Sequence, residues 1–291
     1  MNATSDNLPR ARTIDLPTRG GAVAALEFGP VGRPIDVIFS HANGFNARTY
    51  RSILAPLAQS LRILAIDLRG HGSTTLSAAV EGREGWLQFR DDLLALTAEV
   101  ADGPLVLAGH SMGGASSLLA AAAEPGRVKA LALFDPVVIP SDRQHDALEH
   151  NPLAIGADRR RAVFPSRAAV MEAYTGRGAF RTWSPEQLAD YVEAGFRETL
   201  DGQVTLTCAP AWEASNFRTH NYDIWGAFRE SCCPTRILRA EVGSTCRIEG
   251  HEDELAATGR IEVETVPGTS HFLPMERPDL VRRVLAEVAA E

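Results

Sequence analysis

The sequence predicts an α/β protein in which a mostly parallel central sheet carries a helical cap insertion. Short apolar runs with the length of buried strands alternate along the chain with segments of helical periodicity. Such alternation is typical of a parallel sheet with helices on both faces. Residues 137–230 break the alternation and hold 11 of the 19 aromatic residues. We therefore expect a core of residues 1–136 and 231–291, and a helical cap of residues 137–230 over the carboxyl ends of the strands, where ligands bind in open α/β sheets.

Seven apolar runs are predicted to be strands because they are short, apolar and bounded by Gly, Pro or polar residues. They are residues 22–28, 35–40, 61–66, 105–108, 128–134, 235–240 and 261–266. Three segments have the apolar spacing and end signals of helices, namely residues 86–100, 111–123 and 278–290. A proline follows the second of these and another begins the third, as expected at a helix end and in a first turn.

Composition limits the classes of partner. The chain has 291 residues and a net charge of −8, which argues against nucleic acid and anionic membranes as main partners but says nothing positive about a substrate. Residues 1–12 are polar and are predicted to be a frayed tail rather than a signal peptide, and no apolar run is long enough to span a membrane. Four cysteines without a CxxC motif predict reduced thiols and a cytoplasmic location. The oligomeric state is not predicted.

A single serine stands out in the stretch GHSMGG. Ser111 follows the buried run 105–108, opens a helical segment, and has Gly109 and Gly113 two residues to either side. A very tight turn from strand to helix forces its central residue into a strained conformation and crowds those two flanking positions, so that only small residues fit. The hydroxyl would then be exposed at a helix N-terminus, where the backbone N–H of Met112 can stabilise a developing negative charge.

Two further loops follow predicted strands on the same side of the sheet. The first is HANGF, residues 41–45, from which a backbone N–H can join that of Met112 to bind an oxyanion. The second is GTSHF, residues 268–272, whose His271 can reach back over the sheet toward Ser111. The other histidines are less well placed.

Together these segments resemble the α/β-hydrolase family over nearly the whole chain, in the order HANGF, DLRGHGS, GHSMGG, cap and GTSHF. The resemblance implies acyl transfer to water through a Ser-His-acid triad, without a cofactor. The branches of this family that use an aspartate nucleophile, the dehalogenases and epoxide hydrolases, are disfavoured because position 111 is serine. Where the family usually has His-Gly, this chain has His41-Ala42, and the matching oxyanion amide falls on Asn43.

The triad acid has two candidates. In most of the family it follows the strand after the cap in a stretch like Gly-x-x-Asp, but here that position is Gly243, with Glu241 two residues earlier. The alternative is Asp135, at the end of the strand 128–134. Pro136 bars helix at Asp135 and removes a backbone donor, which places Asp135 at the carboxyl edge of the sheet. We expect Asp135 to be the acid and keep Glu241 as the alternative.

The combined prediction is a serine hydrolase that cleaves a small, mostly apolar carboxylic ester or lactone through an acyl-enzyme. Ser111, His271 and Asp135 would be catalytic, and Phe45, Trp183 and Trp212 would bind substrate. The alternatives are C–C bond hydrolysis or acyl transfer on the same triad, or a ligand-binding receptor on the same fold. No metal is expected, because the histidines of HDALEH, residues 145–150, have the wrong spacing. The basic run of residues 159–161 is predicted to be a solvated face.

Overall fold

The computed structural model describes residues 9–83, 85–139, 151–219 and 222–291. Its main sheet has the strand order β1-β2-β4-β3-β5-β6-β10-β11. The first two pairings, β1 with β2 and β2 with β4, are antiparallel, and all others are parallel. The strands are β1 (Arg10–Leu16), β2 (Gly21–Phe28), β3 (Val37–Ser40), β4 (Ile63–Ile66), β5 (Leu105–His110), β6 (Val128–Phe134), β10 (Thr235–Val242) and β11 (Ile261–Ser270).

All seven predicted strands are confirmed in the main sheet, and the structure adds an eighth strand to that sheet, β1. Residues 10–12, predicted to be part of a frayed tail, belong to β1, while residues 1–8 lie outside the described residues. Strand β1 is an edge strand in which polar side chains alternate with the buried Ile14 and Leu16. Arg10 and Arg12 both pair with the buried Glu27 of β2, so the polar residues that looked like tail are held by a carboxylate of the neighbouring strand.

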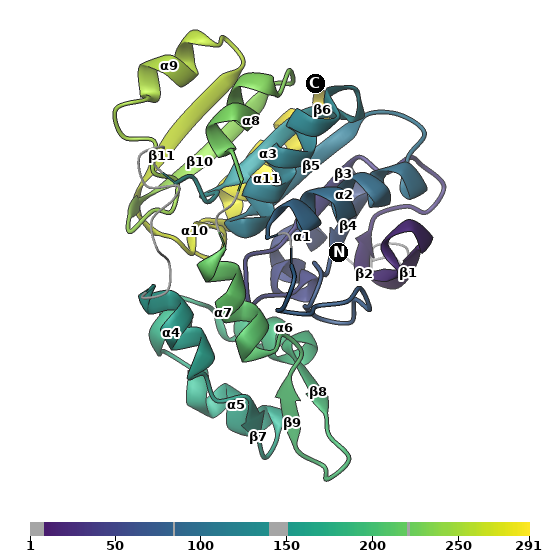
Figure 1. Ribbon diagram of the computed structural model, residues 1–291, viewed down its shortest axis with the longest axis vertical. Helices are drawn as coiled ribbons and strands as arrows, with labels where there is room; N and C mark the ends of the chain where they lie inside the picture. The colour runs from purple at the N-terminus through teal and green to yellow at the C-terminus, as the bar shows by residue number, and fades with distance from the viewer. Residues whose placement is uncertain (1–8, 84, 140–150, 220–221) are drawn as a thin grey trace.

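The central strands are buried on both faces. Along β5, Leu105 and Leu107 join one apolar cluster and Val106 and Ala108 join the other, because side chains of a strand alternate between faces. The first cluster is covered by α2 (Leu87–Val100), α3 (Met112–Ala123) and α8 (Ile224–Glu230), and the second by α1 (Arg51–Leu54) and α11 (Pro278–Ala290). Figure 1 shows α3 and α8 in front of the sheet and α11 behind it. Two short helices, α9 (Glu252–Ala257) and α10 (Leu273–Glu276), flank β11.

A group of cap elements lies beyond one end of the main sheet (Figure 1). Its helices are α4 (Pro152–Asp158), α5 (Arg167–Tyr174), α6 (Pro185–Gly195) and α7 (Pro210–Arg218). The cap was expected to be helical, but it also contains a small antiparallel sheet of β7 (Val163–Phe164), β8 (Phe196–Glu198) and β9 (Val204–Leu206). Strands of two or three residues are too short to show a period of two in the sequence. The division at residues 137 and 230 stays a prediction; α8, near the second boundary, packs against α3.

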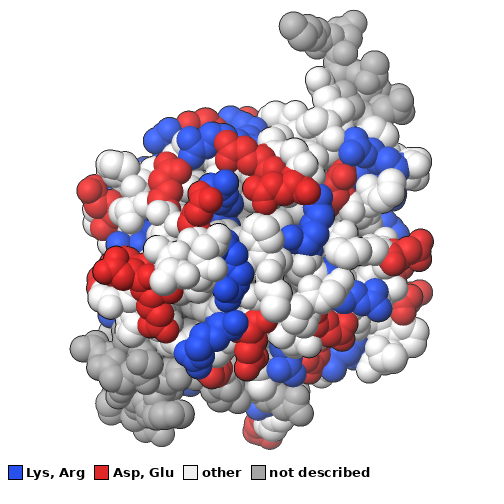
Figure 2. All heavy atoms as spheres, turned by 90° about the horizontal axis from the view of Figure 1, so that it is seen from above, with Lys and Arg blue, Asp and Glu red and all other residues white. Residues whose placement is uncertain are grey.

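The surface carries charges of both signs. On the face shown in Figure 2, acidic and basic side chains are interspersed, so on that face the net charge of −8 is not gathered into one patch. Each of the four cysteines is unpaired. Among the described residues, no helix has both the length and the apolar character needed to cross a membrane.

Candidate active site

Ser111 occupies a strained turn between β5 and α3. Its φ of 56° and ψ of −119° lie in a backbone region that residues with a side chain rarely adopt. A Cβ atom on Gly109 would lie 2.4 Å from the carbonyl carbon of Gly113, and one on Gly113 would lie 2.3 Å from the carbonyl oxygen of Ser40. Both flanking positions therefore exclude any side chain, which is the reason that the sequence surrounds this serine with glycine.

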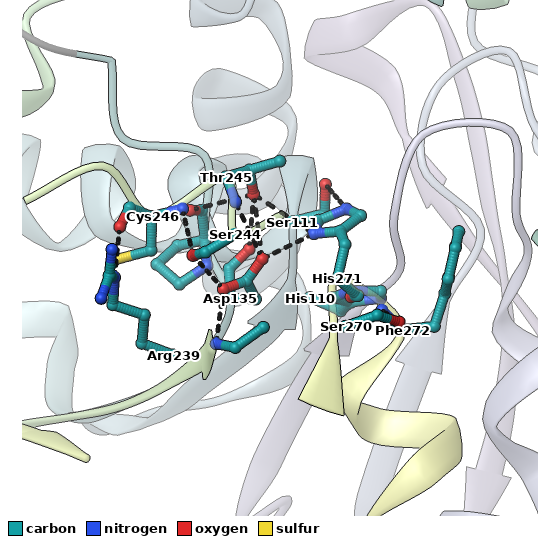
Figure 3. A network of polar contacts seen from close by, with 12 residues as sticks. His110, Ser111, Asp135, Arg239, Ser244, Thr245, Cys246, Ser270, His271 and Phe272 are labelled. Atoms are coloured by element: carbon teal, nitrogen blue, oxygen red, sulfur yellow. Dashed lines mark hydrogen bonds and ion pairs between the residues drawn. The ribbon is translucent and has the colours of Figure 1, made fainter. Parts of the chain in front are cut away.

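His271 connects Ser111 to a buried carboxylate (Figure 3). Its Nε2 atom lies 3.1 Å from the Oγ atom of Ser111, and its Nδ1 atom lies 2.7 Å from Oδ2 of Asp135. Because an ionised carboxylate only accepts hydrogen bonds, Nδ1 carries the proton and Nε2 is left as the acceptor that faces the serine hydroxyl. This is the tautomer that a general base beside a nucleophilic serine requires.

Asp135 is fully buried and surrounded by donors. Its Oδ1 atom accepts from the backbone N–H of Ala240 at 2.9 Å and from the Ser244 hydroxyl at 2.5 Å, and Oδ2 accepts from the backbone N–H of Thr245 at 3.0 Å. Burial opposes ionisation, but the hydrogen bond and charge of His271, with those of the other donors, hold the pKa of this carboxyl below its ordinary value. The carboxylate is therefore ionised at neutral pH.

The backbone at Asp135 has a φ of 43°, which lies in the left-handed region and outside the right-handed helix that the following proline was expected to bar. The Asp135 N–H donates to the carbonyl oxygen of Leu238 at 2.7 Å, and its carbonyl accepts from the Thr245 hydroxyl at 2.9 Å. These two hydrogen bonds hold Asp135 in its left-handed conformation. The alternative acid, Glu241, instead accepts a hydrogen bond from the backbone N–H of Gly268 at 2.9 Å.

The HANGF loop leaves one amide for an oxyanion. The N–H of Ala42 donates to the Tyr50 hydroxyl, that of Gly44 to Nε2 of His71, and that of Phe45 to the carbonyl of Ala42. Of the amides from Ala42 to Phe45, only that of Asn43 has no acceptor among the described residues. The N–H of Met112, in the first turn of α3, is also without an intrahelical acceptor. The structure thus singles out the two predicted amides, while their catalytic role stays a prediction.

Comparison with known proteins agrees with this geometry. Residues 37–284 match the model of the alpha/beta hydrolase family. The chain belongs to the α/β-hydrolase family. Its fold, with an eight-stranded, mostly parallel sheet, is that of the family, and the protein is a hydrolase.

Individual relatives of this hydrolase have varied names. It is 26% identical over 253 residues to a 2-(acetamidomethylene)succinate hydrolase of Mesorhizobium japonicum, covering 86% of each chain. It is 30% identical to a haloalkane dehalogenase of Agrobacterium fabrum, covering 94% of this chain and 90% of that one. A crystal structure of E-2-(acetamidomethylene)succinate hydrolase superposes with a TM-score of 0.78 at 22% identity, over 97% of this chain and all of that one. The two sequence relatives support hydrolase chemistry without naming a substrate for this chain, and the superposed structure supports the fold.

A cavity of about 620 Å³ opens onto Ser111 and His271. Ser111 and His271 form part of its wall, and most of the remaining wall is apolar or aromatic. The aromatic lining consists of Phe45, Tyr174, Phe180, Phe217 and Phe272. Of the three residues predicted to bind substrate, Phe45 is therefore at the cavity wall.

Trp183 and Trp212 are not among the residues that line this cavity, so the cavity gives no support to their predicted contact with substrate, which stays a prediction. Trp183 is 8% exposed and packs edge-on against Phe45 and Phe180. Trp212 is 1% exposed and donates from Nε1 to the carbonyl oxygen of Arg69 at 3.0 Å. A count of aromatic residues in the cap cannot separate residues at a wall from residues that support the wall from behind.

Charged residues of the cap also reach the cavity wall. Arg160 was predicted to lie on a solvated face, but its guanidinium is largely buried, donates to Glu213 Oε2 at 2.9 Å and also bonds the Tyr191 hydroxyl. Arg160, Arg161 and Glu213 all belong to the lining. Sequence reasoning missed Glu213 as well, because its partner lies 53 positions away. The HDALEH segment lies outside the described residues.

Three buried histidines hold the loops around the site. His41 accepts from the backbone N–H of Leu68, and His71 accepts from that of Gly44. His110 lies between the Tyr50 hydroxyl and the carbonyl oxygen of His271, at 2.7 Å from each. Burial lowers the pKa of His71 to about 4 and that of His110 to about 3, and it lowers the pKa of His41 well below its ordinary value. These imidazoles are therefore neutral and structural, and Tyr50 is a supporting residue that no sequence motif indicated.

Proposed function

We propose that this hydrolase is a serine enzyme that cleaves a small, mostly apolar carboxylic ester or lactone through an acyl-enzyme, without a cofactor. The observation that carries the proposal is the continuous contact from Ser111 Oγ through the two ring nitrogens of His271 to Asp135 Oδ2. A nucleophile within hydrogen-bond reach of a base, and a base oriented by a third group, are the marks of nucleophilic catalysis.

The reaction follows from these positions. Nε2 of His271 takes the hydroxyl proton as Ser111 Oγ attacks the carbonyl carbon, and the amides of Met112 and Asn43 hold the oxyanion. Asp135 stabilises the imidazolium, which then gives its proton to the leaving alkoxide as the tetrahedral intermediate collapses. A water molecule, deprotonated by His271, then attacks the acyl carbon. The bond from that carbon to Ser111 Oγ breaks, His271 returns the proton to Oγ, and the acid is released. The nucleophile is the Ser111 hydroxyl and not a carboxylate.

The cavity supports the proposed substrate class. Its volume of about 620 Å³ and its aromatic walls suit a compact, mostly apolar molecule. The proposal takes such a molecule as the partner, with no role for nucleic acid or membrane, and places the enzyme in the cytoplasm.

The arginines of the wall favour a second candidate within the same chemistry. The lining contains two arginines, Arg160 and Arg161, against one acidic residue, Glu213. An arginine guanidinium can donate two hydrogen bonds to a carboxylate group. The relative from Mesorhizobium japonicum is named for the hydrolysis of a succinate derivative. An acyl group that carries a carboxylate is therefore the second candidate. Comparing the mono-p-nitrophenyl ester of succinic acid with p-nitrophenyl butyrate separates the two.

The test uses three readouts on wild type and Ser111→Ala. We expect wild type to hydrolyse p-nitrophenyl acetate or butyrate and to be labelled by a fluorophosphonate probe. Ser111→Ala should lose both properties while circular dichroism shows an intact fold, because loss of the nucleophile costs several orders of magnitude in rate.

The same measurements distinguish the alternatives. A ligand-binding receptor would label slowly, turn over negligibly and gain thermal stability with its ligand. A C–C bond hydrolase or an acyltransferase would label rapidly but release little p-nitrophenol from simple esters in water. Ester turnover retained by folded Ser111→Ala would overturn the proposal.

A further inference from the structure

The side chain of Asn43 connects the HANGF loop to the cap. Its Nδ2 atom donates to the carbonyl oxygen of Glu213 at 2.9 Å, and its Oδ1 atom accepts from Nδ2 of Asn216 at 2.8 Å. Glu213 and Asn216 both belong to helix α7. The neighbouring loop amides are held by Tyr50, His71 and the loop itself, so Asn43 is the residue at which the loop is attached to α7.

The direction of both hydrogen bonds is determined by chemistry. A backbone carbonyl only accepts, so the amide nitrogen of Asn43 must face Glu213 and its oxygen must face Asn216. Asn216 then has to donate, and it is fully buried. The loop and the helix also approach closely beside this residue, since a Cβ atom on Gly44 would lie 2.5 Å from Oε1 of Glu213.

Helix α7 is also hydrogen-bonded to the core, next to the residues that bond Asn43. Nε1 of Trp212 donates to the carbonyl oxygen of Arg69 at 3.0 Å, and Nε1 of Trp86 donates to the carbonyl oxygen of Asn216 at 3.0 Å. Arg69 lies in the loop after β4, and Trp86 immediately precedes α2. The partners that α7 offers to Asn43 are therefore themselves held by hydrogen bonds to the core.

From these contacts we propose that α7 positions the backbone N–H of Asn43, the proposed oxyanion donor, through its two hydrogen bonds to the Asn43 carboxamide. The Asn43 side chain and Asn216 are then positioning residues. The proposal rests on the proposed function, because it concerns the same amide. An oxyanion donor acts at 2.7–3.1 Å from the developing charge, and a displacement of about 1 Å can cost about 10²-fold in rate. Seating of the cap helix thus completes the catalytic site.

The experiment compares four variants with wild type. Asn43→Ala removes both bonds but keeps the backbone N–H, and Asn216→Ala removes one. The double variant tests whether Asn216 acts through Asn43. The matched control is Ser215→Ala, one residue earlier on the same helix, whose hydroxyl bonds the carbonyl of Trp212 and the side chain of Arg83 but not Asn43.

Four quantities are measured for each variant. They are kcat and KM for p-nitrophenyl butyrate, the affinity for a trifluoromethyl ketone that forms an oxyanion adduct with Ser111, and the rate constant of labelling by a fluorophosphonate. The labelling rate needs no turnover. If wild type labels but hydrolyses no ester, the proposed function fails while the labelling rates still test the role of Asn43, and absence of labelling in wild type overturns both.

For Asn43→Ala we expect kcat and the labelling rate to fall about 10- to 100-fold with KM changed less than about twofold, because the lost contact matters in the transition state. Affinity for the ketone should fall in parallel. Asn216→Ala should have a smaller effect that adds nothing in the double variant, and Ser215→Ala should leave the rates unchanged. Equal losses in Ser215→Ala, an unchanged ketone affinity in Asn43→Ala, or full additivity of the two asparagine variants would each refute the proposal.

Discussion

The Oδ2 atom of Asp135 lies 2.7 Å from Nδ1 of His271, although the residues are 136 positions apart in the chain. Asp135 follows β6, which pairs directly with the strand that precedes Ser111, and His271 follows the edge strand β11. The loop after β10, where the family usually carries its acid, instead supplies the Ser244 and Thr245 donors that grip the Asp135 carboxylate (Figure 3).

This arrangement predicts opposite outcomes for the two candidate acids. Asp135→Asn should lower kcat on p-nitrophenyl butyrate by about 10⁴ with little change in KM, because an asparagine favours the wrong tautomer of the histidine. Glu241→Gln should leave kcat within about twofold, since Glu241 bonds the Gly268 amide and not His271. Steady-state kinetics on both variants checks this, and a larger loss in Glu241→Gln would move the acid to that residue.

The side-chain hydrogen bonds from Ser244 and Thr245 to Asp135 should have a measurable effect on kcat. Ser244→Ala combined with Thr245→Val removes two hydroxyl donors from the buried carboxylate, which raises its pKa and frees it to turn away from His271. We expect kcat to fall about tenfold at constant KM. Thr245→Ser keeps a hydroxyl at the same position and serves as the control. An undiminished kcat in the double variant would show that His271 and the backbone N–H groups of Ala240 and Thr245 are sufficient to orient the carboxylate.

Residues at the cavity wall and residues behind it should respond differently. Leu153 is 58% exposed and lines the cavity, so Leu153→Ala should change the preference among p-nitrophenyl acyl chains and alter stability by less than about 0.5 kcal/mol. Trp183 is 8% exposed behind the wall, so Trp183→Ala should cost about 3–5 kcal/mol in the free energy of unfolding. Urea denaturation and a chain-length series measure both effects. A changed preference among acyl chains in a stably folded Trp183→Ala variant would show that Trp183 contributes to substrate binding.

Acid should destabilise the fold through its buried histidines. The pKa values of His41, His71 and His110 are lowered from 6.5 by burial, so below that pH the unfolded chain binds protons that the folded chain does not, and stability falls as the pH falls. Asp67 acts in the opposite direction, because burial raises its pKa to about 6 and the folded chain takes up its proton first. Burial also raises the pKa of Asp190, which acts in the same direction as Asp67. The three histidines outnumber these two carboxyl groups, so a net loss of stability is expected between pH 6.5 and 4.

Urea denaturation at several pH values checks this sign. Each proton contributes up to about 1.4 kcal/mol per pH unit. His71→Gln keeps an acceptor for the Gly44 N–H but cannot be protonated, and it should reduce the slope by about one proton. Stability that rises on acidification from pH 6.5 to 4 would contradict the assignment of neutral, buried imidazoles.

The sequence by itself determined the elements whose signal is local. Buried strands appear as apolar runs, the nucleophile turn appears as Gly109-x-Ser111-x-Gly113 because backbone crowding excludes side chains there, and the order of the loops identifies the family. Even Asp135 could be placed at the sheet edge, since proline restricts the residue before it.

The tertiary structure decided what depends on contacts between distant segments. Strand β1 can be recognised as a strand only beside Glu27 of β2. The cap strands are too short to show the period of a strand in the sequence. Only packing decides which aromatic residues of the cap line the cavity and which lie behind its wall. Whether Arg160 is solvated depends on Glu213, and whether Asn43 can present its amide depends on α7. In each case the deciding partner lies on another segment, and its position follows from packing rather than from the neighbouring residues.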